Sequence, residues 1–320
     1  MKNMEETLLQ LFPMPIRKLF EKAAEKIRDL REIRIRIDHP VLLYIRNEEY
    51  YINGLGQLTK EQDRAVSFTR EEMEEIISYI CKYSPYAYKE QLKQGFLTVA
   101  GGHRVGVAGE IVAEGEEIQS IKNIRFLNIR ISHEILGASR PVLPFIYKKG
   151  ETDQVRAVYN TLIISPPGLG KTTLLRDLIR EISDGNQWSK GQTVGVVDER
   201  SEIAGSFLGK PQNTMGMRTD VMDRCPKVRG MMMLIRSMAP KVLAIDELGT
   251  IEDVKALQKV IHCGCQVLVT IHGDSLEEVF QKAYLRETLS EGCFQRFVVL
   301  KKAGDGENTI QIYDEKGRSW

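Results

Sequence analysis

Hydrophobic and polar positions follow one pattern up to about residue 136 and a different pattern beyond it. In the first part, short runs alternate between apolar and polar residues. Residues 31–37 (REIRIRI), for example, place isoleucines on one face and arginines on the other. Strict alternation predicts half-buried strands. Helical spacing over 15–30 and a capping box that starts at Thr69 predict helices as well. Residues 1–136 are therefore predicted to form a smaller α+β N-terminal domain with mostly antiparallel strands.

In the second part, residues 137–320, apolar runs without alternation are separated by longer stretches with helical spacing. Continuous apolar runs are typical of parallel strands that helices cover on both faces. The runs lie at 162–164, 193–197, 241–245 and 266–271. Two final runs, 296–302 and 308–313, are joined by Gly-Asp-Gly and predict a closing hairpin. This part is predicted to be an α/β domain with a mostly parallel sheet.

One stretch of the second domain carries a phosphate-binding motif. Residues 161–177 (TLIISPPGLGKTTLLRD) contain a buried strand, a loop rich in Pro and Gly, and the start of a helix. In that context, backbone N–H groups and the positive helix N-terminus attract a polyphosphate. We predict that Lys171 contacts the phosphates of ATP and that the Thr172 hydroxyl binds Mg²⁺. The predicted nucleotide-binding residues are Pro167, Gly168, Leu169, Gly170, Lys171, Thr172 and Thr173. The alternative is a glycine-rich turn with a chance Lys-Thr pair.

Polar side chains follow three of the other apolar runs. They are Asp198, Glu199 and Glu202 after the first, Asp246 and Glu247 after the second, and Thr270 and His272 at the end of the third. Because the carboxyl ends of parallel strands meet at one edge of a sheet, these side chains are expected to gather around the nucleotide.

Asp246 and Glu247 follow four apolar residues, which is the Walker B pattern. Asp246 is predicted to hold Mg²⁺, and Glu247 to orient and deprotonate the attacking water. Burying two carboxylates at the end of a strand costs desolvation free energy unless a cation or hydrogen-bond donors lie beside them. The alternative is an acidic helix cap. However, Thr250 already supplies a cap for the helix that follows.

The remaining candidates have weaker signals. His272 is predicted to sense or polarise the γ-phosphate, although a histidine after a strand also serves as a structural hydrogen-bonding group. Asp198, Glu199 and Glu202 are predicted to assist the metal or the water. The alternative for these three acids is a salt-bridged loop around Arg200.

An arginine finger from a neighbouring subunit would complete such a site. The candidates are Arg218, Arg224, Arg229 and Arg236, with Arg125 and Arg130 in the first domain. Each of them is equally compatible with a surface or packing role, and the sequence does not choose among them.

Composition narrows the class of protein. A length of 320 residues favours two domains, and a net charge of +1 gives no field that would attract nucleic acid. We therefore expect no direct nucleic-acid partner. The sequence has neither a secretory signal nor an apolar run of the about 18–20 residues that a transmembrane segment needs. Five cysteines without paired CxxC motifs are typical of a reducing compartment such as the cytoplasm.

These motifs also resemble a known family. SPPGLGKT, VVDERSE, APKVLAIDELG and TIHGDS resemble the Walker A, Asp-box, Walker B and His-box of type II/IV secretion ATPases. Over nearly its full length the chain, including GGHRVGVAGEI and MMMLIRSMAP, is similar to the stage III sporulation protein AA family of endospore-forming bacteria.

The resemblance implies a RecA-like P-loop NTPase core that hydrolyses ATP with Mg²⁺. It also implies a first domain like the N-domain of secretion ATPases and a homo-hexameric ring. The ring would be cytoplasmic and peripheral to the membrane. It would attach through membrane proteins of a sporulation secretion channel between mother cell and forespore.

Three positions depart from the usual motifs. Ser165 stands where a Walker A loop usually has its first glycine. Asp246 stands where secretion ATPases usually have Gly, and Gly249 where they commonly have Arg.

The leading hypothesis is an ATPase that uses hydrolysis to move its first domain and so drive a membrane-associated secretion complex. Two alternatives stay open. A nucleic-acid motor is disfavoured by the near-zero net charge and by the lack of a stripe of basic and aromatic residues. A nucleotide-gated scaffold with little turnover is disfavoured by Glu247.

Overall fold

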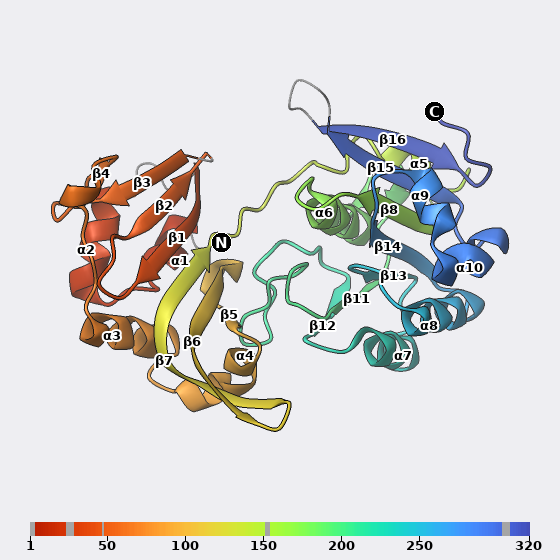
Figure 1. The fold of residues 1–320 in the computed structure, drawn as a ribbon. Coiled ribbons are helices and arrows are strands. Elements are labelled where there is room, and N and C mark those ends of the chain that lie inside the picture. Colours follow the sequence, from red (N-terminus) through yellow and green to blue (C-terminus); the bar gives the residue numbers. More distant parts are fainter. Residues whose placement is uncertain (1–3, 24–28, 47, 151–153, 303–307) are drawn as a thin grey trace. The chain divides into compact units, whose positions relative to one another are not determined.

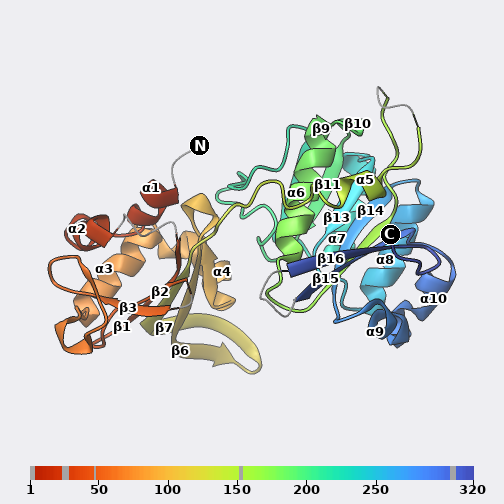
Figure 2. The ribbon, with the colours of Figure 1, turned by 90° about the horizontal axis from the view of Figure 1, so that it is seen from above.

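The computed structural model describes residues 4–23, 29–46, 48–150, 154–302 and 308–320. The chain forms two compact units (Figure 1, Figure 2). Unit 1 is Met1–His133 together with Gly205–Gln212, and unit 2 is Glu134–Ala204 together with Asn213–Trp320. The short second segment of unit 1 therefore interrupts unit 2 in chain order. The sequence pattern gave no sign of this interruption.

Unit 1 contains a seven-stranded antiparallel sheet with the order β4-β3-β2-β1-β7-β6-β5. Its strands are β1 (Leu30–Arg36), β2 (Leu42–Ile45), β3 (Glu48–Ile52), β4 (Leu58–Thr59), β5 (Phe96–Thr98), β6 (Arg104–Glu114) and β7 (Glu117–Arg130). Its helices are α1 (Met4–Leu9), α2 (Met14–Ala23), α3 (Arg70–Ile80) and α4 (Lys89–Lys93).

The alternating pattern explains how this sheet packs. In β1, Ile33 and Ile35 are fully buried and lie opposite Ile129 and Leu127 of β7. They share one hydrophobic core with side chains of α1, α2 and α3. Helix α3 begins at the predicted capping box, in which the Thr69 side chain accepts a hydrogen bond from the Glu72 N–H. The predicted helix over 15–30 is observed up to the end of α2, and its continuation over 24–28 lies outside the described residues. Its predicted end is wrong, because Leu30 is the first residue of β1 and is buried in the core.

Unit 2 contains a second seven-stranded sheet with the order β12-β11-β13-β14-β8-β15-β16. All neighbours pair in parallel except β15 and β16, which form the predicted hairpin. The turn of this hairpin, at 303–307, lies outside the described residues. The strands are β8 (Thr161–Ser165), β11 (Val194–Asp198), β12 (Thr219–Asp223), β13 (Val242–Ile245), β14 (Gln266–His272), β15 (Arg296–Lys302) and β16 (Asn308–Asp314). A separate small pair is β9 (Gly185–Asn186) with β10 (Ser189–Lys190).

Helices cover both faces of this sheet. Side chains of α5 (Leu143–Ile146) and α6 (Lys171–Asp184) pack on one face. Side chains of α7 (Lys227–Ser237), α8 (Ile251–His262), α9 (Leu276–Gln281) and α10 (Arg286–Ser290) pack on the other. In β8, Ile163 belongs to the first core, whereas Leu162 and Ile164 belong to the second. Burial on both faces is why this strand reads as a continuous apolar run. None of the helices in the described ranges is long and apolar enough to cross a membrane.

A buried asparagine fastens the strand that leads to the phosphate-binding loop. Asn160, which precedes β8, is only 8% exposed. Its Oδ1 accepts a hydrogen bond from the Val267 N–H of β14 at 3.1 Å. Its Nδ2 donates to the Cys293 carbonyl, just before β15, at 2.8 Å. The side chain therefore joins β8 to both of its neighbours in the sheet.

We expect Asn160→Ala to lower the free energy of unfolding of unit 2 by about 2 kcal/mol, because it removes the side-chain partner of the buried Val267 N–H and leaves the Cys293 carbonyl only the longer hydrogen bond from the Gln295 side chain, at 3.4 Å. Urea unfolding followed by tryptophan fluorescence measures this, since both tryptophans, Trp188 and Trp320, lie in unit 2. The control is Asn308→Ala, which removes one exposed hydrogen bond to the Leu169 carbonyl. A control as destabilised as the Asn160 variant contradicts the prediction.

Candidate functional site

The loop between β8 and α6 has the backbone of a phosphate-binding loop. Gly168 and Gly170 have φ values of 80° and 91°, in the left-handed region that glycine favours. A Cβ at either position would meet no atom closer than 4.0 Å, so the backbone conformation, not lack of space, requires glycine. Gly170 caps α6, and no side chain of the described residues caps the first turn. The first N–H groups of α6 thus remain available for an anion.

The parallel register brings the ends of four strands to one edge of the sheet. His272 at the end of β14 lies opposite Ser165 at the end of β8, and Ile245 of β13 lies opposite both Val197 of β11 and Val269 of β14. Every polar residue predicted for the site lies at the carboxyl end of one of these strands, follows it directly or begins α6.

The side chains at this edge are in direct contact. Lys171 Nζ is 3.3 Å from His272 Nε2, and Thr172 Oγ1 donates a hydrogen bond to Asp246 Oδ2 at 3.2 Å. His272 Nε2 is 3.6 Å from Glu247 Oε1. The pKa of Lys171 is lowered, because the effect of burial outweighs the opposing effect of the nearby Asp246 and Glu247 carboxylates. The structure therefore brings together these residues from three separate motifs of the sequence.

Thr270 ties the two acidic residues together. Its hydroxyl is fully buried, donates to Asp246 Oδ1 at 2.7 Å and accepts from the Glu247 N–H at 2.9 Å. Asp246 thus lies between the hydroxyls of Thr172 and Thr270. A carboxylate beside a hydroxyl is the oxygen-donor chemistry that Mg²⁺ prefers, so Thr172 and Asp246 fit this ion.

Glu247 has an unusual backbone. Its φ is 49°, a conformation that costs a non-glycine residue about 1–2 kcal/mol. The Leu248 N–H, next along the turn, donates to the Thr270 carbonyl at 2.7 Å. The Glu247 carboxylate lies 3.4 Å from Arg200 Nη1. Strain of this kind occurs where the surrounding structure over-determines a residue, often at functional sites.

The acidic segment after β11 folds around Asp198. This carboxylate is buried and accepts hydrogen bonds from the N–H groups of Glu202, Ile203 and Ala204 at 2.8, 3.1 and 2.8 Å. Burial raises the pKa of Asp198 to about 6, although the three amides act in the opposite direction. Asp198 thus shapes the loop. Glu199 and Glu202 line one small cleft with Asp246 and Glu247.

Sequence reasoning missed two cations at this edge. Arg176 of α6 donates to the carbonyls of Glu202 and Ile203 at 2.8 and 2.6 Å. Its position four residues after Thr172 puts it on the same helix face, which was a usable signal. Lys227, the first residue of α7, donates to the Glu247 carbonyl at 2.7 Å. No motif marks Lys227 in the sequence.

The arginine-finger candidates are spread over both units. Arg218 donates to the Ser183 carbonyl, and Arg224 pairs with Asp223. The others are on α7 or on β7 of unit 1: Arg229, Arg236, Arg125 and Arg130. Within the described part of unit 2, no side chain of Arg218, Arg224, Arg229 or Arg236 forms a hydrogen bond or ion pair with Lys171, Asp246 or Glu247, although the Arg224 N–H donates to the Asp198 carbonyl at 2.8 Å.

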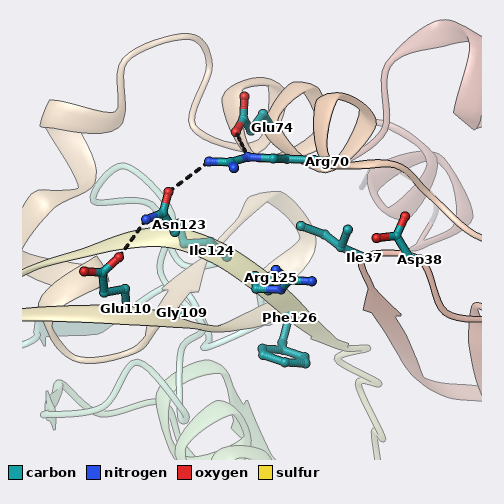
Figure 3. Close-up of a pocket in the computed structure, with 10 residues that line it drawn as sticks. All are labelled: Ile37, Asp38, Arg70, Glu74, Gly109, Glu110, Asn123, Ile124, Arg125 and Phe126. Carbon is teal, nitrogen blue, oxygen red and sulfur yellow. Dashed lines mark hydrogen bonds and ion pairs between the residues drawn. The ribbon is translucent and has the colours of Figure 1, made fainter.

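A larger cleft, of about 550 Å³, lies in unit 1 (Figure 3). Arg70 donates to Glu74 and to Asn123, and Asn123 donates to Glu110, as the dashed lines show. These polar groups bind one another, and the cleft is lined by none of the predicted nucleotide-binding, catalytic or metal-binding residues, although the arginine-finger candidate Arg125 lines it. We therefore place the candidate site at the sheet edge of unit 2.

Comparison of the whole chain decides the family. Residues 2–320 match the family described as "Sporulation stage III, protein AA". The chain belongs to this family. "Stage III sporulation protein AA" of Bacillus subtilis (strain 168) is 40% identical over 289 residues, which cover 90% of this chain and 88% of that protein. The sporulation family predicted from the motifs is therefore confirmed.

Solved structures confirm the fold of this chain. The pilus retraction motor PilT with bound ADP matches with a TM-score of 0.60 and 14% identity, over 92% of this chain and 82% of that one. The Legionella pneumophila ATPase DotB matches with a TM-score of 0.59 and 16% identity, over 95% and 81%. The predicted class, a RecA-like P-loop NTPase core preceded by a smaller α+β domain, is correct.

The raised pKa of Asp198 predicts a pH dependence. A carboxylate with a folded pKa of about 6, above its ordinary value of about 3.9, stabilises the fold fully below the lower value and loses this effect as pH rises through the higher one. Asp198→Asn lacks this titration. The free energy of unfolding of the wild type minus that of Asp198→Asn should fall by roughly 2–3 kcal/mol between about pH 4 and pH 7. Urea titrations at several pH values test this, and a constant difference contradicts it.

Proposed function

We propose that this chain is an ATPase that hydrolyses ATP to ADP and phosphate. The observation that carries the proposal is the convergence of Lys171, Thr172, Asp246, Glu247 and His272 at one edge of a parallel sheet. A lysine, a hydroxyl, a metal-binding carboxylate and a second carboxylate are the groups that phosphoryl transfer to water requires.

Each group has a separate task in this proposal. Residues 167–173 hold the phosphates through backbone N–H groups and the Lys171 ammonium. Thr172 and Asp246 hold Mg²⁺, which supplies positive charge to the β- and γ-phosphates when bound. Glu247 accepts the proton of the attacking water. Glu199 and Glu202 assist from the neighbouring loop, and His272 senses the γ-phosphate.

Because Lys171 and His272 are in contact, nucleotide binding must rearrange them. An ammonium that donates to His272 Nε2 requires this nitrogen to be unprotonated, so the ring proton lies on Nδ1. Nδ1 is buried and has no hydrogen-bond partner among the described residues. A phosphate that draws Lys171 away frees Nε2 and allows the ring to respond. This supports the role of His272 as a sensor.

At the level of the cell, we propose that the ATPase forms a homo-hexamer at the cytoplasmic face of a membrane. Hydrolysis would move the N-terminal domain, residues 1–136, relative to the ATPase domain, residues 137–320. That motion would drive a sporulation secretion channel between mother cell and forespore through its membrane proteins. The family membership and the PilT and DotB folds support this proposal.

Two substitutions separate binding from hydrolysis. Lys171→Ala should weaken ATP binding by about a hundredfold or more, because it removes the cation that faces the phosphates. Glu247→Gln should keep ATP bound but slow phosphate release by at least about a hundredfold, because it removes the base. Fluorescence anisotropy of a labelled ATP analogue and a phosphate-release assay measure the two effects. Lys255→Ala, an exposed lysine on α8, is the matched control.

The outcomes discriminate among functions. Unchanged turnover in either variant refutes the site assignment. Equal, negligible phosphate release by the wild type and by Glu247→Gln indicates a nucleotide-gated scaffold. Turnover that single-stranded DNA stimulates, with a steep dependence on salt, indicates a nucleic-acid motor instead.

The proposed homo-hexamer can be tested by measuring the size of the assembly. With ATP, Mg²⁺ and Glu247→Gln, which should trap the bound state, sedimentation velocity should show a species of six chains. The same measurement on Lys171→Ala should show smaller species, because the nucleotide no longer binds. A sample that stays monomeric with ATP at high concentration contradicts the ring.

A further inference from the structure

Lys227 occupies a position that does not favour a lysine. It is the first residue of α7, where the helix dipole repels a cation by about 0.3–1 kcal/mol. Its side chain is nevertheless only 15% exposed. A half-buried ammonium at a helix N-terminus needs compensating partners, which must come from outside α7 because the first turn of this helix contains no acidic residue.

Three oxygens from three different segments supply this compensation. The Lys227 ammonium donates to the Glu247 carbonyl at 2.7 Å. It lies 3.3 Å from Asp253 Oδ2 at the start of α8 and 3.6 Å from Glu199 Oε2 in the acidic segment. An ammonium has three hydrogens to donate, so these partners match its capacity. The shortest contact is to a backbone carbonyl, not to a carboxylate.

That carbonyl belongs to the strained residue of the site. The Glu247 N–H is held by the Thr270 hydroxyl at 2.9 Å, and its carbonyl by Lys227. Hydrogen bonds thus hold the peptide groups on both sides of Glu247, and they hold it at a φ of 49°. Such a conformation persists only when its surroundings over-determine it. Without Lys227 the carbonyl is free to rotate, the backbone can leave the left-handed region, and the carboxylate loses its direction toward the site.

We propose that Lys227 is a positioning residue, which fixes the Glu247 backbone so that its carboxylate faces the attacking water. This inference rests on the proposed ATPase function, because it assigns the residue that orients the proposed base. It adds a cation that none of the recognised motifs contains. Asp253 supports the same turn, since its Oδ2 also accepts from the Gly249 and Thr250 N–H groups at 3.2 and 3.1 Å.

Kinetics provide the first test, on the full chain. Lys227→Met keeps the length of the side chain but removes its charge and its hydrogen bonds. We expect kcat to fall about a hundredfold, the size of effect that a misplaced catalytic group produces. The Kd of the labelled ATP analogue should stay within about threefold of the wild-type value, because Lys227 does not belong to the predicted phosphate-binding loop. Lys227→Arg should recover part of kcat, and Lys255→Met on the exposed face of α8 should change neither value.

Hydrogen exchange provides a second test that does not need turnover. The N–H groups of Glu247, Leu248, Gly249 and Thr250 are all hydrogen-bonded, to Thr270 or Asp253. In Lys227→Met, the peptide that spans 246–250 should exchange about tenfold faster, while the peptide that spans β8 should not change. The control is again Lys255→Met.

The two tests separate this inference from the proposed function. An unchanged kcat in Lys227→Met overturns the positioning role. So does a loss of ATP binding that matches the loss of kcat, because the lysine is then a general structural residue. If the wild type itself releases no phosphate, the ATPase proposal fails, and the exchange measurement decides about Lys227 alone. If amide hydrogen exchange over 246–250 is then the same in Lys227→Met as in the wild type, the positioning role of Lys227 is wrong.

Discussion

The gathering of negative charge at one edge of the unit 2 sheet is the constraint on which the site depends. Asp198, Glu199, Glu202, Asp246 and Glu247 all line the same small cleft. Carboxylates this close repel one another unless cations or hydrogen-bond donors meet them. Lys227 and Arg200 line the cleft with them, and Lys171 and Arg176 approach from the neighbouring helix. The cations come from segments far apart in the sequence, so only the tertiary fold brings them close enough to compensate the acids.

The acids at this edge of the sheet differ in the hydrogen-bond donors that surround them. The Asp198 carboxylate accepts hydrogen bonds from three backbone N–H groups and so holds the loop that follows β11. The Asp246 carboxylate accepts from two threonine hydroxyls, one of which belongs to the first turn of α6. Glu247 is held through its backbone, and its carboxylate makes longer contacts, 3.4 Å from Arg200 Nη1 and 3.6 Å from His272 Nε2. A base needs such freedom, because its oxygens must be available to water. The same sheet edge therefore gives three acids different surroundings, which fit the structural, metal-binding and base roles that we propose for them.

Much of this arrangement could be predicted from local patterns. The strand, loop and helix around Lys171, the apolar runs of the parallel sheet and the caps at Thr69 and Thr250 each depend on neighbours in sequence, and all are observed. Strand β12 was missed because its five residues, TDVMD, are half-exposed at the edge of the sheet and lack an apolar run. Lys227 was missed for a different reason. Its partners Glu199, Glu247 and Asp253 become neighbours only through tertiary packing.

The segment Gly205–Gln212 shows what no local pattern could reveal. It follows the acidic loop directly, yet it packs in unit 1, where the Gln212 side chain accepts from the Gly101 N–H at 2.9 Å and the Lys82 ammonium lies 4.7 Å from the centre of the Phe207 ring. Two of the three covalent connections between the units therefore flank this segment. One begins right after Ala204, whose N–H is bonded to Asp198. Because peptide bonds transmit displacement without any interface, a motion of unit 1 relative to unit 2 acts directly on the end of the loop that carries Glu199 and Glu202. The chain thus connects unit 1 to the acids of the site through its covalent backbone, independently of how the surfaces of the two units meet.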